Sequence, residues 1–217
     1  MAHDATSLKE GQYYTIEFPI DHEITVQRSR FIASLRVVKN RAEFDREMNE
    51  INRAFPKATH YCWAYRFNDR IPLEHSSDAG EPAGTAGRPI LGALKKYSLL
   101  NIMGVVTRYY GGIKLGVKGL IAAYSLATIE AIEKATIAIN EPKSIVKFAT
   151  SYDLYNLILS RLEHCHIPPS SINAIFDVSI SGEIIVPNSL LPSITLELEN
   201  IASAKSTFSF LVSPFEA

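Results

Sequence analysis

The pattern of apolar and polar residues in the first two thirds of the chain predicts an alternation of strands and helices. Runs rich in aromatic and β-branched residues are typical of strands, and apolar residues at intervals of three or four are typical of helices. The pattern predicts strands at 13–18, 31–38, 60–67 and 102–110, and helices at 41–54, 89–100 and 117–134. A short stretch at 23–27 either extends or replaces the first strand, and we expect Asn40 to cap the first helix.

The last third predicts a second arrangement, which follows a turn-rich segment at 136–144 that contains Asn140, Glu141 and Pro142. The elements expected there are a strand at 145–152, a helix capped by Asp153, strands at 171–176 and 178–186, a helix at 192–204 and a strand at 207–212. This is the split βαβ, or ferredoxin-like, order. We therefore predict an α+β protein with domains at 1–139 and 144–217, the core of the first domain lying at 20–135.

The chain has 217 residues, 47% of them hydrophobic. This is an ordinary globular composition, and a chain of this length can bury a sizeable core. Cys62 and Cys165 show no metal-ligand spacing and predict reduced thiols. Residues 1–12 lack the pattern of a signal peptide, and no apolar run reaches the length of a membrane span. We expect a soluble cytoplasmic protein that has no membrane partner.

The net charge of −1 conceals an uneven distribution of charge. Residues 82–129 contain no Asp or Glu, and their basic residues are Arg88, Lys95, Lys96, Arg108, Lys114 and Lys118. From Phe148 onward, by contrast, acidic residues outnumber basic ones. Because phosphate contacts need positive charge, we expect the first domain and not the second to bind an anion.

The first candidate site is the glycine-rich stretch at 107–119, between a strand end and a helix start. Free backbone N–H groups and the helix dipole attract anions at such a place. It is not a Walker loop, because Val117 stands where that motif requires Lys. We predict phosphate or nucleic-acid contact by Arg108, Tyr109, Tyr110, Gly111, Gly112, Lys114, Gly116, Lys118 and Gly119. The alternative is that the glycines only shape a tight turn.

Tyrosines near these basic residues have two interpretations of their own. Aromatic rings interleaved with Lys and Arg can stack on unpaired bases, or they can fill the core. The tyrosines concerned are Tyr97, Tyr109, Tyr110 and Tyr124.

The second candidate site is the glycine-rich stretch at 77–87 together with the strand before it. Carboxylates beside hydroxyls could hold a divalent ion or perform acid–base chemistry. We favour the alternative, in which Asp78 and Glu81 cap turns and pair with Arg66 or Arg108. Cys62 on a buried strand face is expected to be inert, so we predict no catalytic residue, no metal and no cofactor. The candidate residues are His60, Arg66, Asp78, Gly80, Glu81, Gly84, Thr85 and Gly87.

Three motifs together resemble the IMPACT/YigZ family: HYCWAYR at 60–66, SDAGEPAGTAGRP at 77–89 and VVTRYYGGIKLG at 105–116. The resemblance is close over residues 20–135 and extends to 144–217 in pattern only. It implies a first domain similar to the second domain of a small-subunit ribosomal protein and to domain four of elongation factor G. It also implies a second domain similar to domain five of that factor.

The resemblance also bears on function, since eukaryotic members of the family bind a partner protein and restrain activation of an amino-acid-starvation kinase. They carry a different accessory domain, so we do not expect the same partner here. We expect a non-catalytic, translation-associated regulator that binds RNA, the ribosome or a translation-related protein through its basic glycine loops. Two alternatives stay open: an enzyme that binds a nucleotide or another small phosphate compound on the same fold, and a pure protein–protein adaptor.

Overall fold

The computed structural model describes residues 8, 11–69, 71–205 and 207–214. Most of the segment at 1–12, for which the sequence predicts no targeting signal, lies outside the described residues. The chain forms two compact units, whose main spans are Tyr13–Asn140 and Glu141–Ala217. Each unit combines helices with an antiparallel sheet, which confirms the predicted α+β class.

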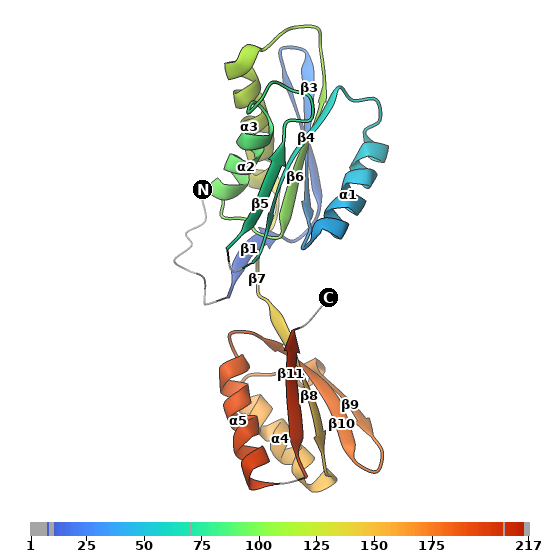
Figure 1. Cartoon of the computed structure of the whole chain (residues 1–217), viewed down its shortest axis with the longest axis vertical. Coiled ribbons are helices and arrows are strands. Elements are labelled where there is room, and N and C mark those ends of the chain that lie inside the picture. The colour runs from blue at the N-terminus through green and yellow to red at the C-terminus, as the bar shows by residue number, and fades with distance from the viewer. Residues whose placement is uncertain (1–7, 9–10, 70, 206, 215–217) are drawn as a thin grey trace. The chain divides into compact units, whose positions relative to one another are not determined.

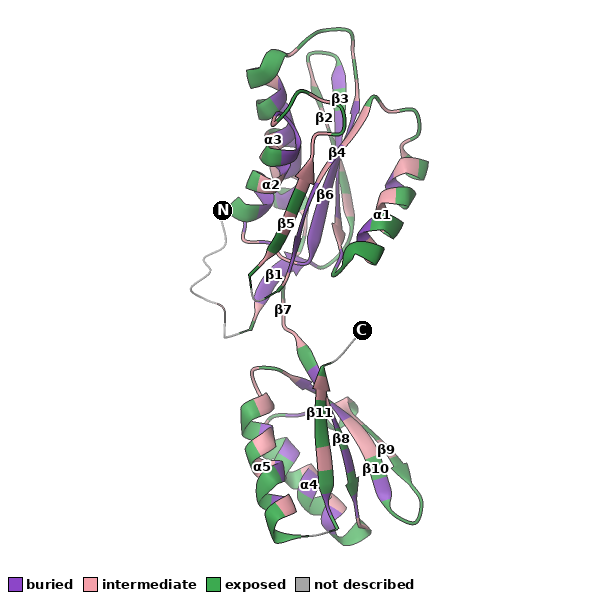
Figure 2. Ribbon diagram, in the orientation of Figure 1, coloured by how far each residue is buried: buried purple, intermediate pink, exposed green. Residues whose placement is uncertain are grey.

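The first unit is built on a five-stranded antiparallel sheet in the order β2-β3-β6-β4-β5. Helices α2 and α3 cover one face of the sheet, and α1 packs on the other (Figure 1). Figure 2 shows β6 as buried along most of its length. The elements are β2 (Ile20–Val26), β3 (Ser29–Val37), α1 (Arg41–Ala54), β4 (His60–Phe67), β5 (Leu73–Ser77), α2 (Gly87–Lys96), β6 (Ile102–Tyr109) and α3 (Gly116–Lys134).

Local sequence explains how several of these elements begin and end. Asn40 caps α1, as predicted, by accepting a hydrogen bond of 3.0 Å from the backbone N–H of Glu43. The prediction that the second helix reaches residue 100 was wrong, because α2 ends at Lys96. Ser98 adopts a left-handed conformation (φ 55°), and the N–H of Leu99 then bonds back to the carbonyl of Leu94.

The stretch at 23–27 was predicted to extend or replace the first strand, but it belongs to β2, a separate strand in another sheet. Two further strands were not predicted. Strand β5 has the sequence LEHSS, which lacks β-branched residues, and it forms because it pairs with β4 at the edge of the sheet. Strand β7 (Ile137–Asn140) lies inside the segment predicted as turns and pairs with β1 (Tyr13–Ile16). Strand β7 depends on a partner far away in the sequence, and β5 depends on pairing with the strand before it, because its own residues carry little strand pattern.

The second unit has the predicted strand-helix-strand-strand-helix-strand order, and its antiparallel sheet runs β11-β8-β10-β9. Buried residues from the sheet and both helices form its core, Phe148, Ile158, Ile184 and Leu198 among them. The helix cap was predicted wrongly: Ser151 occupies the N-cap position, and Asp153 lies in the first turn. The elements are β8 (Lys143–Thr150), α4 (Tyr152–His164), β9 (Ile172–Phe176), β10 (Ile180–Pro187), α5 (Leu191–Ala204) and β11 (Ser209–Pro214), with a short 3₁₀ turn, η2 (Pro169–Ser171), before β9.

Candidate functional site

The two glycine-rich stretches meet in the first unit and enclose a hollow of about 430 Å³, which we call the glycine-loop pocket. Its walls come from the start of β4, the loop between β5 and α2, the end of β6 and the start of α3. The lining residues are Thr59, His60, Glu81, Pro82, Arg108, Tyr110, Lys114, Leu115, Gly116, Val117 and Leu120. Tertiary structure thus joins the two motifs that the sequence analysis treated as separate sites.

Asp78 organises the loop that forms one wall of the pocket. Its carboxylate accepts hydrogen bonds from the backbone N–H groups of Gly84, Ala86 and Gly87, at 2.7, 2.9 and 2.8 Å. Burial alone raises the pKa of Asp78, but these three donors and the charge of Arg88 together hold the pKa below its ordinary value. Asp78 therefore stays ionised at neutral pH and caps the loop, as predicted. Its expected pairing with Arg66 or Arg108 is not present among the described residues, where these arginines pair with Glu74 and Glu81 instead.

Two glycines allow these loops to lie directly against neighbouring backbone. A Cβ atom on Gly87 would lie 2.8 Å from the backbone of Ser77, and one on Gly111 would lie 1.9 Å from the carbonyl oxygen of Arg28. Real Cβ atoms do not approach backbone so closely, so only glycine fits at either place. Close packing of the backbone around the pocket therefore accounts for these two glycines without a ligand.

A buried ion pair forms the base of the pocket. Nη1 of Arg108 lies 2.6 Å from Oε1 of Glu81, and the two side chains are only 6% and 4% exposed. The rings of Phe31 and Tyr110 each lie 5.3 Å from the guanidinium carbon. Nη2 contacts Ser29 Oγ at 3.5 Å, whereas Nε has no hydrogen-bond partner among the described residues. Arg108 is thus a buried, paired cation, and direct contact with a nucleic-acid phosphate would require it to be uncovered.

Tyr124 and Cys62 extend this buried network below the pocket. The hydroxyl of Tyr124 donates to Glu81 Oε1 at 2.8 Å, and the Sγ of Cys62 lies 3.3 Å from that hydroxyl. Burial, the largest cause, raises the pKa of the Cys62 thiol to about 12, and burial also raises the pKa of Tyr124. Both groups are therefore neutral at physiological pH, and Cys62 has no nucleophilic character there.

We expect the Cys62 thiol to resist alkylation by iodoacetamide in the folded protein at neutral pH, because only the thiolate reacts. Cys165 in α4's C-cap is half-buried, so it should be modified first even though burial also raises the pKa of its thiol. Peptide mass mapping before and after urea unfolding measures the difference. Rapid modification of Cys62 in the folded state would contradict this description of the network.

The start of α3 supplies the exposed positive side of the pocket. The helix has no acidic residue in its first turn and no side-chain cap at Leu115, so its first backbone N–H groups keep the capacity to bind an anion. Gly116 enters the helix with a φ of +69°, a conformation that favours glycine. Lys114 and Lys118 flank these N–H groups, and both lysines are exposed.

The structure brings together part of the predicted site. The predicted residues that line the pocket are His60, Glu81, Arg108, Tyr110, Lys114 and Gly116. Arg66 lies elsewhere: its Nε pairs with Glu74 at 2.9 Å, so of the two alternatives for Glu81 only the pairing with Arg108 is present. The remaining residues predicted in the loops and at the helix start do not line the pocket; they are Tyr109, Asp78, Gly80, Gly84, Thr85, Gly87, Gly111, Gly112, Lys118 and Gly119.

The four tyrosines divide between core and surface. Tyr97 and Tyr124 are 3% and 0% exposed, so stacking on a base by either ring is excluded in this conformation. Tyr109 donates from its hydroxyl to the carbonyl of Pro56. Tyr110 is 45% exposed and lines the pocket, and it is the tyrosine placed to meet a ligand.

The apolar part of the pocket was not predicted from the sequence. Its apolar lining residues are Pro82, Leu115, Val117 and Leu120. Val117 is 58% exposed and lines the mouth of the pocket. In the sequence, the signal for this apolar lining was an apolar residue next to a glycine. The same pattern is typical of ordinary helix packing.

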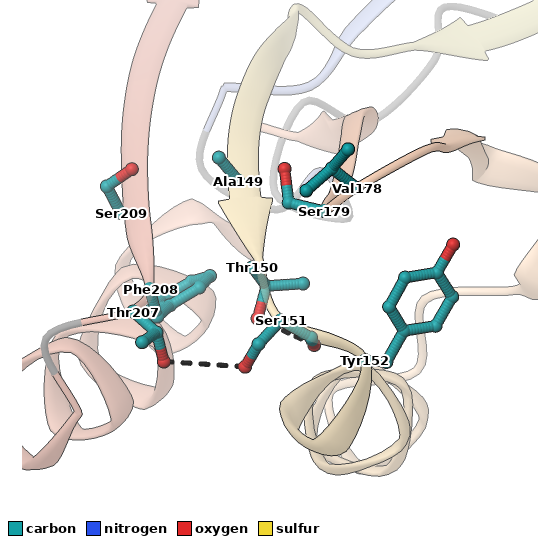
Figure 3. Close-up of a pocket in the computed structure, with 9 residues that line it drawn as sticks. All are labelled: Ala149, Thr150, Ser151, Tyr152, Val178, Ser179, Thr207, Phe208 and Ser209. Carbon is teal, nitrogen blue, oxygen red and sulfur yellow. Dashed lines mark hydrogen bonds between the residues drawn. The ribbon is translucent and has the colours of Figure 1, made fainter.

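The other candidate sites show fewer features of a binding or catalytic site. Within the described ranges, no group of three or more His, Cys, Asp and Glu residues could hold a metal ion. The second unit has a hollow of about 350 Å³ near the start of α4, shown in Figure 3. Its lining is rich in hydroxyls but contains no charged side chain: Ala149, Thr150, Ser151, Tyr152, Val178, Ser179, Thr207, Phe208 and Ser209.

The fold and the site define a two-unit α+β protein whose first unit carries a pocket between two glycine loops. Residues 27–132, which contain this pocket, match the family model of the Impact N-terminal domain. YigZ of Escherichia coli (strain K12) is 32% identical over 142 residues, which make up 64% of this chain and 70% of YigZ. The chain therefore belongs to the IMPACT family, as its three motifs predicted.

Two further comparisons bear on the extent of the likeness. YvyE of Bacillus subtilis (strain 168) is 40% identical over 141 residues, which cover 65% of this chain and 64% of YvyE, just under two thirds of that relative. A crystal structure described only as a hypothetical protein matches with a TM-score of 0.67 and 25% identity, over 96% of this chain and 99% of the other. This neighbour confirms the two-domain fold.

No helix within the described ranges combines the length and the apolar character that crossing a bilayer requires.

Proposed function

We propose that this protein is a non-catalytic regulator associated with translation, and that its first unit binds RNA through the face around the glycine-loop pocket. The observation that carries the proposal is the start of α3, where exposed Lys114 and Lys118 flank uncapped backbone N–H groups. No acidic residue in 82–129 opposes this charge, and the one carboxylate in the pocket, Glu81, is neutralised by Arg108. Such a surface attracts the phosphates of a nucleic acid whatever its base sequence.

The buried network supports binding over catalysis. The Cys62 thiol and the Tyr124 hydroxyl are neutral at physiological pH because burial raises the pKa of each. Glu81 accepts hydrogen bonds from Arg108 and Tyr124 at Oε1, and these two contacts hold the carboxylate in place. The polar groups beneath the pocket therefore fix its shape.

We predict that replacing Lys114 and Lys118 with Gln weakens RNA binding evenly across sequences. Each lysine that contacts a phosphate should contribute about 0.7 to 1 unit to the slope of log K against log salt concentration. Fluorescence anisotropy over a salt series measures this slope for the wild type and for the double variant Lys114→Gln/Lys118→Gln.

The matched control is Lys39→Gln/Lys96→Gln, which removes the same charge from two exposed lysines that do not line the pocket. Equal losses in the two double variants would show that only the net charge matters and would contradict the proposed site. Absence of salt-dependent RNA binding by the wild type would overturn the proposed function and favour a protein–protein adaptor.

A further inference from the structure

The glycine-loop pocket contains more apolar surface than phosphate binding requires. A phosphate is held by charge and N–H donors, but the lining of the pocket also includes the apolar residues Pro82, Leu115, Val117 and Leu120. The volume of about 430 Å³ falls within the range of roughly 300–1,000 Å³ that is typical of sites for small organic groups. The pocket therefore fits a ligand that joins an anion to a flat or apolar body.

Arg108 provides a second, independent indication that the pocket takes a ligand. The residue is 95% buried, since its relative exposure is 5%, and it lines the pocket. Its Nε has no hydrogen-bond partner among the described residues, although unsatisfied buried donors of this kind are rare in folded proteins. Nε is itself enclosed, so a polar ligand atom would reach this unused donor only after its cover moves aside, on a residue already held in place by Glu81 and Phe31.

Tyr110 adds an aromatic surface at the mouth of the pocket. Its ring lies over the Arg108 guanidinium at 5.3 Å and is 45% exposed, so the ring is fixed by one contact while part of its surface remains open. The backbone N–H of Tyr110 donates to Thr59 Oγ1 at 3.1 Å, which further holds the residue in place. A preordered ring next to a positive helix start is suited to stacking on a nucleobase.

We propose that the pocket receives one unstacked nucleotide of a single-stranded RNA. Its phosphate binds at the start of α3 beside Lys114 and Lys118, and its base lies between Tyr110 and the apolar lining at Val117. A base inside a duplex is already paired and stacked, so only a single strand fills the pocket. This inference rests on the proposed function and deepens it, because phosphate contacts alone do not distinguish single strands from duplexes.

The test compares binding of a short oligouridine and of an RNA duplex of similar length, by fluorescence anisotropy at low salt. The main variant is Val117→Trp, which places a large side chain at the mouth of the pocket without a change in charge. Leu126→Trp is the matched control: Leu126 lies on the same helix, is 45% exposed and does not line the pocket. Thermal unfolding of both variants checks that each is folded.

We expect the wild type to prefer the single strand. Val117→Trp should lower the affinity for oligouridine about fivefold or more, and it should lower the affinity for the duplex far less. Tyr110→Ala should also lower the affinity for oligouridine. Tyr110→Phe, which keeps the ring, should bind oligouridine like the wild type, and so should Leu126→Trp.

Other outcomes separate the two proposals. If RNA binds and depends on Lys114 and Lys118, but Val117→Trp behaves like Leu126→Trp, the pocket inference is overturned and the proposed function stands. If the wild type binds neither RNA, both are overturned. If uridine monophosphate alone binds as tightly as the oligonucleotide, the pocket is a small-molecule site and the inference fails.

Discussion

Replacing Glu81 with Ala is expected to lower the free energy of unfolding by about 3–5 kcal/mol, because it leaves the Arg108 guanidinium buried without a counter-charge. Both side chains are almost fully enclosed, at 6% and 4% exposed, so the guanidinium is poorly hydrated and depends on this carboxylate. The hydroxyl of Tyr124 loses its acceptor at the same time. Urea unfolding followed by circular dichroism measures the change, with the linear dependence on urea giving the free energy.

Two further variants show whether the effect comes from the unpaired charge. The double variant Glu81→Ala/Arg108→Leu should recover part of the stability, because no buried charge remains. Glu23→Ala breaks an ion pair with Arg30 on the surface and should change stability far less. If Glu81→Ala cost no more than Glu23→Ala, the pair at the base of the pocket would not be the buried contact described above.

The Gly111→Ala variant is expected to lose about 3 kcal/mol of stability, at the upper end of the usual cost of overpacking. The added Cβ would lie 1.9 Å from the carbonyl oxygen of Arg28 and 2.6 Å from the backbone nitrogen of Ser29. Backbone cannot yield as a flexible side chain can, so the loop must move away from β3. That movement should also weaken RNA binding, because Gly111 leads directly into the pocket wall. Urea unfolding and the anisotropy assay measure the two effects.

Gly92→Ala provides the opposite control. Gly92 is exposed in α2, has no heavy atom within 4 Å of an added Cβ and has no left-handed backbone conformation. The substitution should stabilise the protein by about 0.5–1 kcal/mol, since alanine loses less backbone entropy in a helix. Equal effects of Gly111→Ala and Gly92→Ala would contradict the close approach of the loop to Arg28.

Much of the fold could be predicted from the sequence because its main elements carry strong local patterns. The residue span of β4 was predicted without error, and the cap at Asn40 and the order of the last six elements were also predicted correctly. The end of α2 was missed because a left-handed serine stopped the helix where apolar periodicity continued. Strand β7 was missed because its partner β1 lies far away in the sequence, and β5 was missed because its residues lack the β-branched pattern of a strand.

The candidate site was only partly predictable, and the reason is physical. The sequence shows that Arg108 is basic and lies near glycines, but it cannot show that Glu81 reaches Arg108 and neutralises it across 27 positions. The identity of Tyr110 as the exposed tyrosine likewise depends on where β6 ends. The apolar lining formed by Leu115, Val117 and Leu120 could not be predicted, because it depends on the two loops lying on opposite sides of one pocket.

The most direct test of the central claim is to map RNA binding onto the backbone by NMR. Titration of the ¹⁵N-labelled full chain with oligouridine should shift amide signals at Tyr110, Lys114 and Gly116–Gly119, while signals of the second unit stay in place. Such a result would place the RNA at the glycine-loop pocket. Shifts confined to residues 141–217, or no shifts at all at low salt, would contradict the claim that the basic face of the first unit binds RNA.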